Sequence, residues 1–314
     1  MKNKIVYLFL LVAFLSAICA NSKNLSKKVE TQKLKALIVN GQNNHNWKIG
    51  SDALEQILEG SGLFAVDVAT SPEKGADMSN FKPSFSAYDL IVLDYNGDEW
   101  CDEAKSSFVS YVKNGGGVFV MHAADNSFPN WKEYNEIIGL GGWGKRNEKD
   151  GPYVYVDDNG KVVRDNSPGN GGAHGQQHEY IVKARKPNHP IIKGLPGEWL
   201  HAQDELYHGL RGPAENMTIL ATAWSDPATK SKSKFLPTGR NEPALMTIEY
   251  GKGRIFHTIM GHASEKNQAM KCAGFIVTSL RGAEWAATGK VTQAVPKNLP
   301  TKTEVILWED YKEK

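Results

Sequence analysis

Cysteine and net charge are both scarce in this sequence. It holds three cysteines in 314 residues, and its formal net charge at pH 7 is +2. Cys19 directly follows an N-terminal apolar run, so Cys101 and Cys272 are left for the rest of the chain. Two cysteines do not make the disulfide framework of a small secreted domain. Because the basic residues are scattered and not interleaved with aromatic ones, no nucleic-acid partner is expected.

Sequence motifs that bind nucleotides or metals are also absent. There is no P-loop, and no Gly-x-Gly-x-x-Gly opens a helix after a first strand, which argues against a nucleotide cofactor. The Cys-x-x-Cys, His-Glu-x-x-His and EF-hand spacings are missing, so spacing alone predicts no metal ligands and no cofactor. His174 and His178 stand four residues apart, but in a glycine-rich segment rather than on a helix face.

An apolar run follows Lys2 and Lys4 at the N-terminus. It covers residues 5–18, whereas a transmembrane helix needs about 20 apolar residues. Basic residues, a short apolar run and small residues after it are typical of a secretory signal peptide. We therefore predict a signal peptide over residues 1–20, a polar tether over 21–33, and an exported protein that is periplasmic or secreted. The alternative is a lipoprotein acylated at Cys19, which would be its one attachment to a membrane.

Strand-like and helix-like segments alternate from residue 34 onward. We predict one domain over residues 34–290 and a tail over 291–314, with helices starting near Ser51 and Asp102 and another over 266–280. This alternation is typical of an α/β fold in which helices cover both faces of a mostly parallel sheet. Ligands of such sheets bind beyond the carboxyl ends of the strands. The predicted strands are 34–39, 64–69, 90–93, 118–121, 180–182, 218–223, 244–249 and 254–259.

A glycine-rich insertion over residues 139–177 interrupts the alternation. Asn159-Gly160 stands between two strand-like runs and predicts a β-hairpin over residues 153–163. Long insertions of this kind are commonly lids or binding loops. We therefore expect the insertion to lie near the binding site.

One histidine stands at the end of a buried strand. Three glycines precede the apolar residues 118–121, and His122 is followed by two alanines. Small residues at this point allow a sharp strand-to-helix turn, as in the nucleophile elbow of α/β-hydrolases. An imidazole at such a turn transfers protons or binds a metal, and a covalent serine or cysteine mechanism is not expected there.

Other polar residues follow predicted strands and are candidates for the same site. A glycine precedes His262 just after the strand over residues 254–259, which repeats the pattern of His122. The segment over residues 201–208 supplies two adjacent acids, a phenol and two imidazoles. We predict His122, Asp204, Glu205 and His262 as catalytic residues, and Asn44, His45, Trp47, Asp94 and Tyr207 as substrate-binding residues.

The ordered set of these motifs resembles the ThuA-like (trehalose-utilisation) family. The resemblance extends over about residues 34–287, most of the chain after the tether. It is carried by residues 34–39, Asn43-Asn44-His45, 88–93, 115–124, Asn188-His189-Pro190-Ile191, Asp204-Glu205-Leu206-Tyr207, 251–256 and Gly261-His262.

The resemblance implies a fold and a metabolic role. The implied fold is similar to the flavodoxin-like sheet of class I glutamine amidotransferases, with the insertion added. It also implies that His122 stands where an amidotransferase has its cysteine, so glutaminase activity is not expected. A link to carbohydrate catabolism is implied as well, notably of 3-keto-disaccharides made by partner dehydrogenases.

Three functions are consistent with these residues. In the first, the protein is an enzyme acting on a sugar or 3-keto-glycoside, with His122 as general acid or base. Asp204 or Glu205 is then its carboxylate partner, His262 supports it, and no cofactor is required. In the second, a metal-dependent hydrolase binds a divalent metal through His45, His122, Glu205 and His262. In the third, the protein binds a carbohydrate without catalysis. A small carbohydrate is the partner in each case, and a homo-oligomer is left open.

Overall fold

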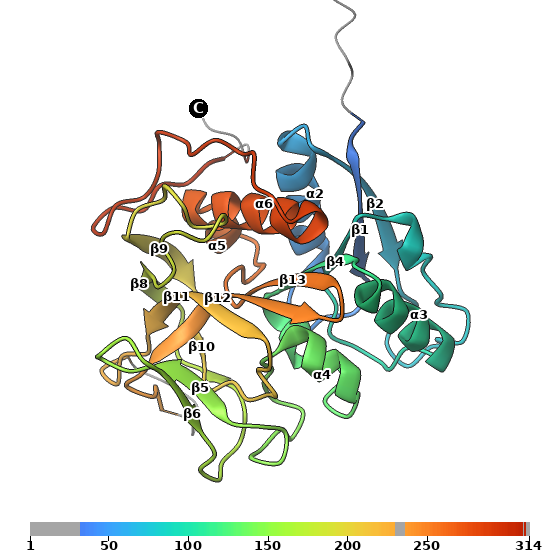
Figure 1. Ribbon diagram of the computed structural model, residues 1–314, viewed down its shortest axis with the longest axis horizontal. Helices are drawn as coiled ribbons and strands as arrows, with labels where there is room; N and C mark the ends of the chain where they lie inside the picture. The colour runs from blue at the N-terminus through green and yellow to red at the C-terminus, as the bar shows by residue number, and fades with distance from the viewer. Residues whose placement is uncertain (1–31, 230–235, 310, 312–314) are drawn as a thin grey trace, which may run out of the picture. The chain divides into compact units, whose positions relative to one another are not determined.

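An eleven-stranded mixed sheet forms the centre of the protein (Figure 1). The computed structural model describes residues 32–229, 236–309 and 311. The predicted signal peptide, nearly all of the predicted tether, and Cys19 therefore lie outside the described residues. Within the described part of the chain, no helix is long and apolar enough to cross a membrane. Cys101 and Cys272 are both free thiols.

One half of the sheet is parallel, as predicted. The strand order is β2-β1-β3-β4-β13, and each neighbouring pair runs in the same direction. Every residue of β3 and β4 is buried, which suits strands covered on both faces. The strands are β1 (Leu34–Asn40), β2 (Phe64–Thr70), β3 (Leu90–Leu93), β4 (Gly117–Met121) and β13 (Gly253–Thr258).

The other half of the sheet is antiparallel, so the prediction of a mostly parallel, flavodoxin-like sheet is correct for one half only. The order continues β13-β12-β11-β8-β9, and β5 and β6 branch from β12. Four strand pairs of the whole sheet are parallel and six are antiparallel. The reason is local: a tight turn between Tyr250 and Gly253 reverses the chain, whereas a parallel pair needs a longer crossover. The strands are β5 (Tyr153–Val156), β6 (Val162–Asp165), β8 (His178–Ala184), β9 (Glu198–Asp204), β11 (Met217–Trp224) and β12 (Asn241–Tyr250).

A separate two-stranded ribbon comes from the predicted insertion and from the segment after β9. It pairs β7 (Ala173–His174) with β10 (Tyr207–His208), an association that joins residues far apart in the sequence. The predicted hairpin is present as β5 and β6.

Helices cover both faces of the parallel half. Figure 1 shows α2 (Trp47–Gly60) and α6 (Ala273–Thr288) on one face, with the short α5 (Gln268–Lys271) beside β9 of the other half. It shows α3 (Asp102–Lys113) and α4 (Lys132–Ile138) on the other. Short 3₁₀ turns are present at η2 (Phe85–Ala87) and η3 (His122–Asn126).

Two predicted helix boundaries are wrong. The first helix begins at Trp47 and is capped by Asn46, whose side chain accepts a hydrogen bond from the backbone N–H of Ile49 at 3.4 Å. Ser51 lies inside that helix and is buried. The helix predicted over residues 266–280 is divided at Cys272, where the backbone is extended.

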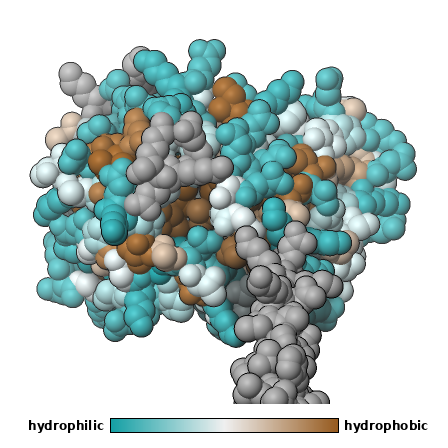
Figure 2. All heavy atoms as spheres, turned by 90° about the horizontal axis from the view of Figure 1, so that it is seen from above, coloured by the Kyte–Doolittle hydropathy of each residue, from teal (hydrophilic) through white to brown (hydrophobic). Residues whose placement is uncertain are grey.

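The parallel half packs so closely on α6 that one position requires glycine. A Cβ atom added at Gly117, the first residue of β4, would lie 2.6 Å from the backbone of Ala286 in α6. This contact fixes the depth of the strand that ends just before His122. Outside the core, hydrophilic side chains cover most of the face that Figure 2 shows, with hydrophobic ones in separate groups between them.

Candidate functional site

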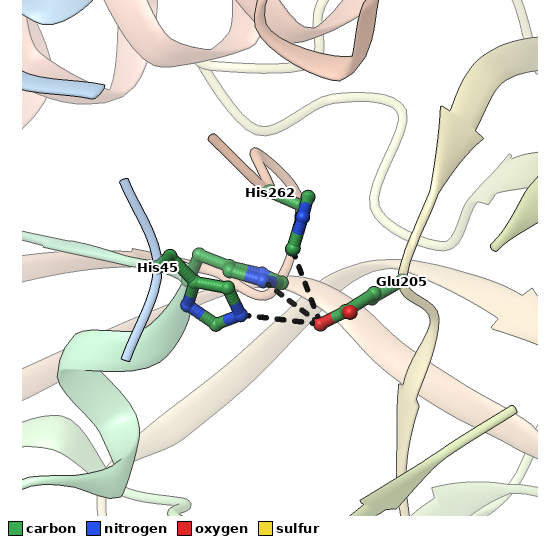
Figure 3. A group of neighbouring side chains, drawn as sticks. His45, Glu205 and His262 are labelled. Atoms are coloured by element: carbon green, nitrogen blue, oxygen red, sulfur yellow. Dashed lines mark hydrogen bonds and ion pairs between the residues drawn. The ribbon is translucent and has the colours of Figure 1, made fainter. Parts of the chain in front are cut away.

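Three histidines and one glutamate meet at the carboxyl edge of the parallel strands. His45 follows β1, His122 follows β4 and His262 follows β13, so parallel strands bring all three to the same edge. Glu205 comes from the turn between β9 and β10. Figure 3 shows His45 and His262 pointing toward the carboxylate of Glu205. We call these four residues the His/Glu cluster.

The distances from Glu205 to the three histidines are those between ligands around one metal ion. Glu205 Oε2 lies 3.3 Å from His45 Nε2, 3.6 Å from His122 Nε2 and 3.3 Å from His262 Nδ1. The four ligand atoms all lie within 4.8 Å of one another. Ligand atoms about 2.0–2.2 Å from a shared metal in tetrahedral geometry are separated by about 3.3–3.6 Å. The cluster can therefore hold a divalent cation with little rearrangement.

The fold orients two of the histidines toward the cluster. His122 has a left-handed backbone, with φ of 43°, and its Nδ1–H donates to the carbonyl of Ile259 at 2.5 Å. Because Nδ1 carries the hydrogen, Nε2 presents a lone pair to the cluster, as a metal ligand must. His262 follows Gly261, whose φ is 110° and where a Cβ would lie 2.8 Å from the ring of Phe275. The turn that carries His262 therefore depends on close packing of Gly261 against the ring of Phe275.

The electrostatics of the cluster suit cation binding. Burial alone would raise the pKa of Glu205, but the imidazoles of His122, His262 and His45 around its carboxylate hold that pKa well below its ordinary range. Glu205 is therefore a carboxylate. Burial lowers the pKa of His45, which favours the neutral imidazole that ligates a metal. Burial would also lower the pKa of His122, but Glu205 and Asp204 raise it, so a cation that binds there displaces a proton.

Asp204 lies behind the cluster rather than in it. Its side chain is fully buried, and it accepts hydrogen bonds from His201 Nε2 at 2.8 Å and from three backbone N–H groups. Those groups belong to Glu205 at 2.7 Å, Gly261 at 2.8 Å and His262 at 3.1 Å. The structure thus places Asp204 where it fixes the backbone of two cluster residues. Both carboxylate oxygens are occupied by these contacts, so the geometry favours a positioning role for Asp204 over the predicted catalytic one.

A cavity of about 460 Å³ opens beside the cluster. It adjoins the cluster at Tyr207, whose ring stacks on His122 with centroids 4.2 Å apart. Amide and aromatic side chains dominate its lining. The lining residues are Asn44, Asn96, Gly97, Glu99, Asn126, Phe128, Pro129, Trp143, Gly144, His174 and Tyr207.

The predicted substrate-binding residues fall into three groups. Asn44 and Tyr207 line the cavity, and His45 belongs to the cluster. Asp94 is buried beneath α2, where it accepts hydrogen bonds from other side chains, and it does not line the cavity. Trp47 is half-buried at the start of α2 and does not line the cavity either. The structure therefore does not bring Asp94 and Trp47 to the cavity with Asn44 and Tyr207, since the helix that follows β1 begins at Trp47 and covers Asp94.

Sequence reasoning missed several residues of the cavity. Asn96 and Phe128 lie in loops after β3 and after η3, Asn126 ends η3, and Trp143 and His174 lie in the insertion. A signal was present for Asn96 and Asn126, because each lies soon after a parallel strand. A signal was present for Trp143 as well, because an aromatic residue in a predicted lid suits stacking on a sugar ring. No local signal distinguishes His174, whose place depends on the pairing of β7 with β10.

Asp94 gives a testable pH dependence of stability. Burial raises its pKa from 3.8 to about 7, although hydrogen bonds from Ser51 and Asn43 and the charge of His122 oppose this. Between about pH 4 and 7, Asp94 is protonated in the folded protein but ionised in the unfolded chain. The free energy of unfolding therefore falls as the pH rises through that window. Asp94→Asn removes the titration. We expect the stability of the variant relative to wild type to rise with pH, by about 1.4 kcal/mol per unit and on the order of 4 kcal/mol at most.

Urea unfolding of both proteins from pH 4 to 8, with chelator present, measures this difference. A pH-independent cost of the added NH₂ group moves the whole difference curve without changing its slope. A difference that stays flat between pH 4 and 7 contradicts the buried, raised pKa of Asp94.

The comparisons with known proteins identify the family. The chain matches the profile of ThuA, described as trehalose utilisation, over residues 35–286. It is 54% identical to a Parabacteroides merdae ATCC 43184 protein described as ThuA-like, whose crystal structure matches with a TM-score of 0.86 over 90% of this chain and 100% of that one. A Bacteroides uniformis ATCC 8492 protein, also described as ThuA-like, is 18% identical and shares the fold, with a TM-score of 0.57 over 86% of this chain and 96% of that one. No curated protein matches the chain. Since the family profile covers most of its length, the chain belongs to the ThuA (trehalose utilisation) family.

Proposed function

We propose that the protein is an exported, metal-dependent enzyme that acts on a sugar or 3-keto-glycoside. The convergence of His45, His122, His262 and Glu205 on one point carries this proposal. Three imidazole nitrogens and one carboxylate oxygen are ligands suited to zinc and to other first-row divalent metals. The composition of residues 1–20 supports export.

The cavity supports a carbohydrate as the substrate. Asn44, Asn96 and Asn126 offer amide donors and acceptors, and the buried Oδ1 of Asn126 has no hydrogen-bond partner among the described residues. Trp143 and Tyr207 supply aromatic surface, with ring centroids 4.7 Å apart. Polar groups beside aromatic rings suit a polyhydroxylated ring, and about 460 Å³ is within the usual range for small-molecule sites. Membership of a trehalose-utilisation family agrees with this substrate class.

The chemistry follows from the position of the metal ligands beside the cavity. A divalent metal at the cluster would polarise a substrate carbonyl. The ketone of a 3-keto-glycoside already acidifies its neighbouring C–H bonds, so polarisation favours proton removal as the first step of elimination, hydration or isomerisation. His122 is then a metal ligand rather than the acid or base, because Nδ1 is held by the carbonyl of Ile259 and Nε2 faces the cluster.

Metal content tests the proposal directly. Protein purified without added metal should carry close to one first-row divalent ion per chain by elemental analysis. Exhaustive dialysis against a chelator should abolish turnover of methyl 3-keto-glucoside, and one equivalent of the metal should restore it. Chelated, metal-free protein that turns over the keto-glucoside at the wild-type rate would falsify the metal-dependent function.

The same cluster also fits a metal-dependent hydrolase, in which the metal lowers the pKa of a bound water molecule. The two functions differ in their substrates. A hydrolase cleaves an unoxidised glucoside as well as its 3-keto form, whereas proton removal requires the ketone. Parallel assays of methyl glucoside and methyl 3-keto-glucoside therefore separate them.

A further inference from the structure

His174 occupies the border between the cavity and the His/Glu cluster. It pairs with Tyr207 across the β7–β10 ribbon, so both side chains lie on the same face, and both line the cavity. The neighbouring pair, Ala173 and His208, belongs to the opposite face of the ribbon. The ribbon therefore directs one imidazole and one phenol toward the substrate.

The imidazole of His174 is beside the cluster without belonging to it. Its Nδ1 lies 3.9 Å from Oε1 of Glu205, the oxygen that does not face the three cluster histidines. That separation is too long for a hydrogen bond. The side chain of His174 is 37% exposed, whereas that of His122 is 1% exposed. His174 thus remains open to the cavity when the cluster holds a metal.

The hydrogen bond of His174 assigns its tautomer. Nδ1 lies 2.9 Å from the carbonyl oxygen of Gly175, which can only accept, so Nδ1 carries the hydrogen. In the neutral ring the lone pair is then on Nε2. Among the described residues, none donates a hydrogen bond to that nitrogen. Nε2 is therefore a free proton acceptor at the wall of the cavity.

Other groups near the cavity are less suited to accept a proton. A lone pair that binds a metal cannot also accept a proton, so the four residues of the His/Glu cluster are not candidates for the base. Asp204 is fully buried and accepts four hydrogen bonds. Glu99 lines the cavity but forms an ion pair with Lys105.

The geometry points to His174 as the catalytic base of this site, acting on a carbon acid whose carbonyl oxygen is held at the cluster. This inference rests on the proposed function. Nε2 removes a proton from the carbon next to the ketone, and the C–H electron pair forms a C=C bond while the carbonyl π pair moves onto oxygen. The proton stays on His174 as an imidazolium beside the Glu205 carboxylate. The imidazolium is open to the cavity and exchanges this proton with water before a proton is returned to the same carbon, so no oxidant or reductant is needed.

Deuterium exchange tests this step without requiring a complete reaction. Metal-loaded protein is incubated with methyl 3-keto-glucoside in D₂O, and NMR follows deuterium entering the C–H positions beside the ketone. His174→Gln is expected to slow this exchange by about 10²–10⁴-fold, the usual range for loss of a positioned acid or base. Its metal content should equal that of wild type. Added imidazole should restore part of the exchange in His174→Ala, which a purely structural role would not produce.

His178→Gln is the matched control. His178 lies on the same segment, and its Nδ1 also bonds a backbone carbonyl, that of Gln176 at 2.8 Å, but it does not line the cavity. Exchange by this variant should stay within about threefold of wild type. Wild-type exchange by metal-loaded His174→Gln overturns the inference, as does metal-loaded wild-type protein that catalyses no exchange. Failure of the proposed function appears separately, as wild-type protein that binds no metal or works without it.

Discussion

Glu205→Gln should leave a folded protein that no longer retains a divalent metal. Glu205 is the one anionic member of the cluster, and one of its oxygens faces all three histidines at 3.3–3.6 Å. The amide removes the negative charge and one ligand oxygen while keeping the size of the side chain. Loss of a residue that merely supports a ligand lowers metal affinity by 10–100-fold, so losing a ligand should cost more than about 100-fold. Isothermal titration with zinc or manganese, together with turnover of methyl 3-keto-glucoside, measures both losses.

Glu99→Gln provides the matched comparison for Glu205→Gln. Glu99 lines the same cavity but belongs to a different contact, the ion pair with Lys105. The Glu99→Gln variant should bind the metal as wild type does. The substitution should change only the Michaelis constant for the substrate. Equal metal affinity in Glu205→Gln and Glu99→Gln would show that the four residues do not form a metal centre.

The sequence predicted the part of the site that depends on parallel strands. His45, His122 and His262 follow strands whose apolar runs are easily recognised, and parallel strands necessarily bring such residues to one edge. Glu205 was also predicted, but together with Asp204, which lies behind the cluster and holds its backbone. Nothing in the sequence separates Asp204 from Glu205, because which of two adjacent carboxylates faces the cavity depends on how β9 ends.

The antiparallel half was harder to predict for a physical reason. Strand β9 buries polar residues, among them His201 and Asp204, which satisfy each other by a hydrogen bond. A buried strand that carries a charged pair lacks the apolar pattern by which buried strands are recognised. The β7–β10 ribbon is only two residues long on each side, and it places His174 beside Tyr207 through a contact that no local propensity encodes.

Asp204→Asn should weaken the metal centre without removing any of its ligands. Asp204 accepts from the backbone N–H groups of Glu205, Gly261 and His262, so it fixes the two turns that carry Glu205 and His262. An amide can accept with only one of its two terminal atoms, so at least one of these contacts is lost. We expect metal affinity to fall by about 10–100-fold, as for other residues that orient ligands.

The same substitution should also destabilise the fold, because Asp204 is paired with a buried histidine. Burial would lower the pKa of His201, but Cys272 and Asp204 raise it to about 10, so the pair is ionic. Removing one partner of a buried ion pair costs about 3–5 kcal/mol.

Asp94→Asn is the control, since Asp94 is equally buried but accepts from the neutral side chains of Ser51 and Asn43. Urea unfolding of the chelated proteins should separate the two variants by several kcal/mol at pH 5, and zinc titration should show weakened binding in Asp204→Asn alone. If both variants lose the same stability and keep wild-type zinc affinity, Asp204 does not organise the centre, and the turns carrying Glu205 and His262 are held by packing alone.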